Sequence, residues 1–190
     1  FDLVSFDDRM GRPTDLPTFR VLKNEPFVSF KARLASHFEV PDQLMRLWVL
    51  VNRQNKTVRP DALVPENDPS LTLEMVRDRM ASRQNDLRFF MELIDPNSLA
   101  MVHLNPNVRG DAIMIFLKYF DTSRQTLLGV SRMYVQRHMK VGDLVPTINE
   151  LMRWPPSTQV KLFEEIKHGM IEQLKFKATF VQSELQDGDI

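Results

Sequence analysis

The chain contains no cysteine among its 190 residues. For these residues, disulfide bonds, thiolate metal sites and thiol nucleophiles are therefore excluded. No run of about 18 apolar residues occurs, so the sequence predicts no membrane-spanning helix. The 25 basic and 25 acidic side chains cancel, whereas non-specific nucleic-acid binding needs a concentrated positive charge. We expect no catalytic thiol, no membrane partner and no nucleic-acid partner.

The patterns of the commoner catalytic and metal sites are also missing. The four histidines, at positions 37, 103, 138 and 168, do not pair with other ligand types at helical spacing, which argues against zinc. No glycine-rich phosphate loop, serine nucleophile elbow or EF-hand loop is present. We expect no catalytic residues, no metal and no cofactor in this segment.

The amino terminus gives an expectation about context. It begins F-D-L-V, without an initiator methionine and without the basic and apolar regions of a signal peptide. We read the chain as part of a longer protein. The lack of cysteine is compatible with a reducing compartment, and we expect an intracellular protein, nuclear or cytoplasmic.

The first half of the chain alternates between strand and helix patterns. Phe27, Phe30, Leu34 and Phe38 form one apolar stripe at helical spacing, after a start signal at Pro26. Pro41 should close this helix, and a polar stretch should cover 52–60. Residues 45–51 are rich in strand formers, which predicts a central strand. Further strands are expected at 1–7, 18–23 and 87–94, and a short helix at 70–80.

The second half repeats this order in outline. A strand over 112–120 and a hairpin partner over 127–136 precede a helical stripe over 141–152. Trp154-Pro155-Pro156 should stop that helix. A further strand is expected at 160–166, and another begins at 187–190.

The repeated order predicts an α+β fold of two tandem β-grasp domains. In each, one main helix covers one face of a mixed sheet. The intervening 96–110 holds proline, asparagine and glycine with little periodicity, as is typical of a linker. We assign 1–95 to the first domain, 96–110 to the linker and 111–190 to the second domain, its last strand truncated.

Several runs of sequence resemble one protein family. The run R-L-W-V-L-V-N-R-Q-N-K-T-V-R-P at 46–60 is similar to the first ubiquitin-like domain after the catalytic domain in the herpesvirus-associated ubiquitin-specific proteases. The opening F-D-L-V resembles that domain's first strand. I-F-L-K-Y-F-D at 115–121, L-F-E-E-I-K at 162–167 and E-L-Q-D-G-D-I at 184–190 are similar to the second domain. The resemblance is closest to a fungal-type relative.

The resemblance implies a non-catalytic segment of a cysteine-type deubiquitinase. The catalytic domain would lie before Phe1, further ubiquitin-like domains would follow Ile190, and both would belong to the same chain. In the family, the second domain grips lysine-rich segments of substrates or regulators with an acidic surface. By position, that surface is Glu184, Asp187 and Asp189, with Glu164 and Glu165 on the matching strand as second-rank candidates.

Other interpretations of these residues remain open. In one interpretation, Glu184, Asp187 and Asp189 form an ordinary solvated turn. Arg53, Lys56 and Arg59 form a small basic cluster that contacts an acidic partner or is solvated. Arg20 and Lys23 would serve a different function, in which a β-grasp scaffold binds a small GTPase through a basic strand. A free ubiquitin-like modifier is disfavoured, because the chain ends D-G-D-I and not in two glycines.

Overall fold

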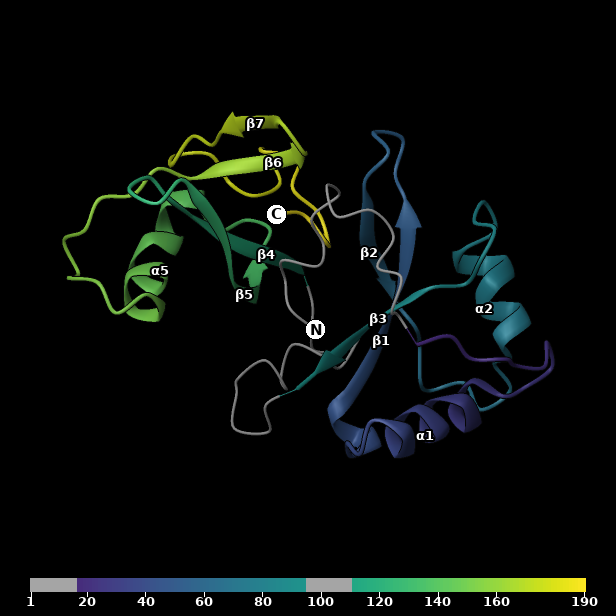
Figure 1. Ribbon diagram of the computed structural model, residues 1–190. Coiled ribbons are helices and arrows are strands. Elements are labelled where there is room, and N and C mark those ends of the chain that lie inside the picture. The colour runs from purple at the N-terminus through teal and green to yellow at the C-terminus, as the bar shows by residue number, and fades with distance from the viewer. Residues whose placement is uncertain (1–16, 95–110) are drawn as a thin grey trace. The chain divides into compact units, whose positions relative to one another are not determined.

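The computed structural model describes residues 17–94 and 111–190. The described residues fall into two compact units, 17–94 in the first and 111–190 in the second, each with its own apolar core. Both units combine antiparallel strands with few helices (Figure 1). The expected strand at 1–7 and the expected linker at 96–110 lie outside the described residues.

The first unit is built on a three-stranded sheet in the order β2-β1-β3. Strand β1 (Met45–Asn52) is central and antiparallel to β2 (Val58–Leu63) and β3 (Phe89–Leu93). Its alternate residues Met45, Leu47 and Val49 are buried in the first core, as the period of a strand requires. The predicted central strand is confirmed.

Helix α1 (Phe27–His37) contributes Phe27, Phe30 and Leu34 to the same core. The chain leaves the helix through Phe38 and through Glu39, whose φ is 54°, so the helix ends before Pro41. Helix α2 (Leu73–Met80) adds Leu73 and Val76 to the core. The Thr72 side chain accepts a hydrogen bond from the Met75 amide at its start, a cap of the kind that stabilises a helix by about 1 kcal/mol.

One expectation for the first unit is wrong, and one element was not expected. Residues 18–23 form no strand: Leu22 is 72% exposed and Val21 42%, so the alternation buries neither face. Phe19 instead packs edge-on against Phe30 of α1. The polar stretch at 52–60 contains the start of β2, which includes Pro60. Proline is tolerated there because β2 is an outer strand of the described sheet.

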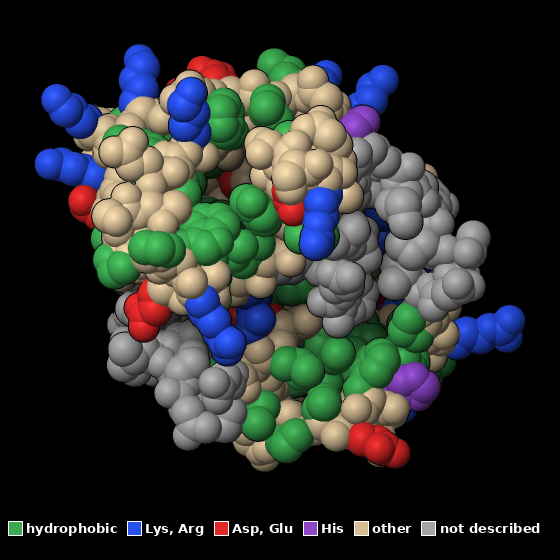
Figure 2. Space-filling model, turned by 60° about the vertical axis from the view of Figure 1, so that its left-hand side comes forward, with side chains coloured by type: hydrophobic (Ala, Val, Ile, Leu, Met, Phe, Trp, Pro, Cys, Tyr) green, Lys and Arg blue, Asp and Glu red, His purple; other side chains and the backbone are tan. Residues whose placement is uncertain are grey.

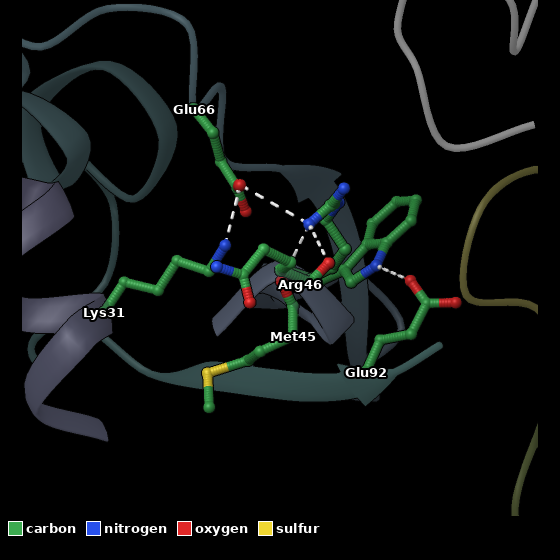
Figure 3. Close-up of polar contacts among 7 residues, drawn as sticks. Lys31, Met45, Arg46, Glu66 and Glu92 are labelled. Carbon is green, nitrogen blue, oxygen red and sulfur yellow. Dashed lines mark hydrogen bonds and ion pairs between the residues drawn. The ribbon is translucent and has the colours of Figure 1, made fainter. Parts of the chain in front are cut away.

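Polar contacts tie α1 to the sheet (Figure 3). Lys31 Nζ lies 2.7 Å from Glu66 Oε2, and Arg46 Nη1 of β1 lies 3.4 Å from the same oxygen. On β1, the buried Trp48 donates its Nε1–H to Glu92 Oε2 of β3 at 2.8 Å. Trp48 therefore belongs to the interior of the protein, as its apolar flanks predict.

The second unit begins with a long hairpin of β4 (Ala112–Asp121) and β5 (Thr126–Gln136). The predicted helical stripe divides between the 3-10 helix η4 (Val141–Leu144) and α5 (Val145–Leu151). Val141, Leu144 and Ile148 are buried in the second core with Ile113 and Ile115 of β4. Leu151 is 44% exposed and does not belong to that core.

A second hairpin follows, made of β6 (Phe163–Lys167) and β7 (Met170–Gln173). The strand expected at 160–166 therefore starts three residues later, and β7 was not expected. Among residues 17–94 and 111–190, none of the helices has both the length and the apolar character needed to cross a bilayer.

Candidate docking site

The last residues of the chain lie between the two hairpins of the second unit. The Gly188 amide donates to Met114 O at 2.8 Å, and the Phe116 amide donates to Asp189 O at 2.8 Å. Asp189 thus pairs in parallel with Ile115 of β4. On the other side, the Glu165 amide of β6 donates to Ile190 O at 2.9 Å. The strand expected at 187–190 is thus reduced to one bridge at Asp189 within a turn, although its backbone hydrogen bonds place 187–190 between β4 and β6.

This position fixes the carboxylates of Asp187 and Asp189. Asp187 Oδ1 accepts a hydrogen bond from the Met114 amide at 2.7 Å. Asp189 Oδ2 accepts one from the Gln186 amide at 2.8 Å. Asp189 is only 6% exposed. Asp187 therefore binds the backbone of β4 and Asp189 binds the backbone of the turn, so neither is a simply solvated carboxylate.

Glu184 and Gly188 shape the turn in which these carboxylates lie. Both have positive φ, 58° for Glu184 and 83° for Gly188, and glycine takes this conformation without a steric penalty. The Glu184 side chain is exposed, whereas Asp187 is half-buried. From the solvent side, the acidic turn therefore presents Glu184 and part of Asp187, with the Asp189 charge beneath them.

The two second-rank residues have different surroundings. Glu165 Oε2 lies 2.7 Å from Lys118 Nζ of β4, and both side chains are largely buried. Glu165 therefore already holds a cation from its own chain. Glu164 lies on the opposite face of β6, directly across from Glu172 of β7. Like charges in this cross-strand position repel each other.

Sequence reasoning did not single out Lys118 or Glu172. The turn of the hairpin that places Glu172 beside Glu164 has one signal in the sequence, Gly169, whose φ is 75°, but strand β7 after it has no strand pattern of its own. Lys118 has no such signal. Its contact with Glu165 spans 47 residues and depends on the arrangement of strands around 187–190.

The chemistry of the acidic turn suits a flexible cation. A carboxylate has about four acceptor positions, so it can bind several donors at once, ammonium groups among them. Lysine carries a compact charge on a long stem and reaches separate carboxylates. Within the residues that the structure describes, no group of three histidine or acidic side chains is placed to hold a metal ion.

The basic residues considered above do not form a common surface. Arg59 is buried with 1% exposure, and its Nη1 donates to Val58 O, whereas Lys56 is exposed at the β1–β2 turn. Lys23 lies in a turn, 3.7 Å from Glu74. The strand needed to present Arg20 and Lys23 to a small GTPase is absent from the described residues.

Comparisons with known proteins find similarity to ubiquitin carboxyl-terminal hydrolases. The chain is 33% identical over 190 residues to ubiquitin carboxyl-terminal hydrolase 5 of Schizosaccharomyces pombe, and 32% identical over 195 residues to ubiquitin C-terminal hydrolase 13 of Arabidopsis thaliana. Each match covers 100% of this chain but 17% of the relative. The chain thus spans a small part of these proteins and, lacking cysteine, contributes no thiol nucleophile.

A family model also matches residues 45–190, and its description is the ICP0-binding domain of ubiquitin-specific protease 7. This match includes all of the second unit and most of the described first unit. It agrees with the resemblance carried by the runs at 46–60, 115–121, 162–167 and 184–190. The chain therefore belongs to the family of the ICP0-binding domain of ubiquitin-specific protease 7.

Proposed function

We propose that this chain is a partner-docking and regulatory segment of a cysteine-type deubiquitinase. The observation that carries the proposal is the match over 45–190 to a family described as a binding domain. The assignment to a deubiquitinase is supported by relatives that are ubiquitin carboxyl-terminal hydrolases. These relatives are much longer than this chain, which covers 17% of each. The catalytic domain of the same protein would then be one of its partners.

We further propose that the second unit binds lysine-rich protein segments through Glu184, Asp187 and Asp189. Three carboxylates within six residues give a concentrated negative charge. The backbone hydrogen bonds of Asp187 and Asp189 hold two of them in fixed positions, which lowers the entropy lost on binding. Glu164 is a secondary contact. Glu165 is the weakest candidate, because Lys118 already neutralises it.

Binding should be of modest affinity and sensitive to salt. An exposed ion pair contributes about 0.2–1 kcal/mol, and a flexible peptide loses entropy when it is ordered. We therefore expect a dissociation constant on the order of micromolar for a peptide with two lysines a few residues apart. The affinity should fall as ionic strength rises, since exposed charges are screened over about 10 Å at 0.1 M salt.

The test removes charge and keeps the hydrogen bonds. In the triple variant Glu184→Gln, Asp187→Asn and Asp189→Asn, amide oxygens still accept from Met114 and Gln186, so the turn should stay folded. We expect this variant to bind the two-lysine peptide at least about tenfold more weakly in calorimetry, the equivalent of about 1.4 kcal/mol. A reversal to lysine is less informative, because it would also remove the acceptors of the turn.

The matched control neutralises two aspartates of the first unit, Asp42→Asn with Asp61→Asn, and should leave the affinity unchanged. Backbone amide spectra of both variants report whether the fold is intact. Equal binding by the wild type and a folded triple variant would show that this assignment of the site is wrong, whatever the role of the rest of the chain.

A further inference from the structure

Strand β7 has one backbone edge that is not paired within the described residues. The Leu174 amide donates to Leu162 O at 2.9 Å, and Glu164 lies opposite Glu172. Bonded and non-bonded pairs alternate along an antiparallel ladder, so Glu172 bonds to β6, whereas the N–H and C=O of Ile171 and Gln173 point away from it. Among residues 17–94 and 111–190, nothing bonds to these outward groups.

The side chains along this edge are exposed and of two kinds. Ile171 is 64% exposed, and Phe163, on the same face of the hairpin, is 44% exposed. On the face that Figure 2 shows, hydrophobic side chains likewise reach the surface in several patches, between projecting lysine and arginine side chains. The other face of β7 carries Glu172, which is exposed and lies across from Glu164.

Of the features that usually protect an outer strand, β7 has shortness and one charged side chain, Glu172, but no proline or lysine. Natural sheets cover or blunt such edges with proline, lysine, bulges or neighbouring elements, and β2 of the first unit carries Pro60. Strand β7 has the sequence M-I-E-Q, without proline or lysine. It is short, with four residues, and lies at the outer side of β6 (Figure 1).

We propose that β7 is a docking edge onto which an extended basic segment of another protein adds as a further strand. Side chains alternate between the faces of a strand. A residue of the added segment that lies opposite Glu172 therefore has its side chain on the acidic face, and its two neighbours have theirs on the face of Ile171. The fitting segment therefore alternates lysine or arginine with apolar residues. Charge complementarity to Glu172 and Glu164 selects the cation, and backbone hydrogen bonds to Ile171 and Gln173 supply affinity.

This edge is separate from the turn of Glu184, Asp187 and Asp189, and the two are distinguished by experiment. The probe is a capped peptide of about eight residues in which valine and lysine alternate, titrated into the full chain. We expect the amide protons of Ile171 and Gln173 to become protected from hydrogen exchange on binding, because they acquire acceptors. Protection of the Glu172 amide should not change, since it already bonds to β6.

Two changes block the edge without touching the β6–β7 bonds. Gln173→Pro removes an amide proton that faces outward, at a position where an edge strand tolerates proline, and should weaken binding at least tenfold. The second change is made in the peptide, which is methylated on every second backbone nitrogen. Two isomers result, one methylated on the valine nitrogens and the other on the lysine nitrogens. One of its two isomers must lose at least tenfold in affinity, because only one set of N–H groups faces β7.

Further variants test the charge and the separation of the two surfaces. Glu172→Lys should raise at least fivefold the peptide concentration needed to protect the amides of Ile171 and Gln173, whereas Glu184→Gln, which weakens binding at the acidic turn, should leave that concentration unchanged. The proposal is overturned if both methylated isomers bind as well as the parent peptide, or if Ile171 and Gln173 gain no protection. If Glu184→Gln weakens binding and Gln173→Pro does not, the peptide binds the acidic turn, and the edge proposal fails.

Discussion

The bond between Trp48 and Glu92 joins two side chains that are withdrawn from water. Trp48 has 0% exposure and Glu92 1%, and the Nε1···Oε2 distance is 2.8 Å. A buried donor that loses its acceptor costs more than the bond contributes when it is present, because the desolvated group cannot return to water. Glu92 therefore has a structural task in β3 that its charge alone would not suggest.

We predict that Glu92→Ala lowers the free energy of unfolding of the first unit by about 1–3 kcal/mol, as expected for an orphaned buried N–H. Glu92→Gln retains an oxygen that can accept from Trp48 and should cost less. Urea unfolding followed by tryptophan fluorescence measures both. Equal losses for the two variants would mean that the hydrogen bond to Trp48 is not what stabilises this site.

The turn between β4 and β5 depends on one carboxylate. Asp121 Oδ1 accepts from the Ser123 hydroxyl at 2.6 Å and from the amides of Ser123 and Arg124 at 2.9 and 3.1 Å. The hydroxyl hydrogen bond of Ser123, and then the Arg124 amide, lower the pKa of Asp121 below its ordinary value. These bonds favour the charged form and close the hairpin.

We predict a loss of stability in acid that depends on Asp121. A lowered pKa in the folded state stabilises the protein above the unfolded pKa of about 3.9, and this contribution is lost as pH falls through the folded pKa. The wild type should therefore lose more stability than Asp121→Asn between about pH 4 and pH 2. Unfolding free energies of both proteins across this range check the sign. A constant difference between them would contradict it.

At the scale of elements, regular patterns were the most predictable part of the fold. The apolar stripe from Phe27 to Leu34 gave α1, and the unbroken run at 45–51 gave β1, since burial follows the period of the element. The strand expected at 187–190 is only a turn with one bridge, between Asp189 and Ile115. Gly188 has the positive φ for which its lack of a side chain suits it.

The elements that sequence did not reveal are those whose burial depends on distant neighbours. Strand β2 contains Pro60 and the buried Arg59, neither of which is typical of a strand. All four residues of β7 are exposed, so no hydrophobic period marks it. For the proposed acidic site, the residues were proposed from the sequence and remain a prediction. Burial of Asp189 and the pairing of Glu165 with Lys118 come only from tertiary packing.

At the scale of the whole molecule, the two cores are made from different stretches of chain. Residues of the first core come from 27–81, and those of the second come from 113–185. Leu47 is 1% exposed and Ile113 is 0% exposed. Leu47 lies on β1 of the first unit, and Ile113 lies on β4 of the second. These two residues allow each core to be weakened separately.

We predict that Leu47→Ala and Ile113→Ala each destabilise mainly the unit in which they lie, by about 2–5 kcal/mol. Native-state hydrogen exchange gives the measurement, with the amides of Val49 and Ile115 as reporters of the first and second units. Each substitution should lower protection chiefly at the reporter of its own unit. If either lowers protection equally at both reporters, the two units unfold as one, and the proposed domain division at 96–110 fails.

The central place of 187–190 has a consequence for synthesis on the ribosome. Strand β4 and its partner β5 leave the exit tunnel first, but the contact of Met114 with Asp187 closes over 73 residues. At about 5–20 residues per second, a nascent chain needs roughly 4–15 seconds to supply that partner. During this interval the apolar side chains of β4 lack part of their final packing, so the second unit cannot complete its fold until the last of residues 187–190 has been made.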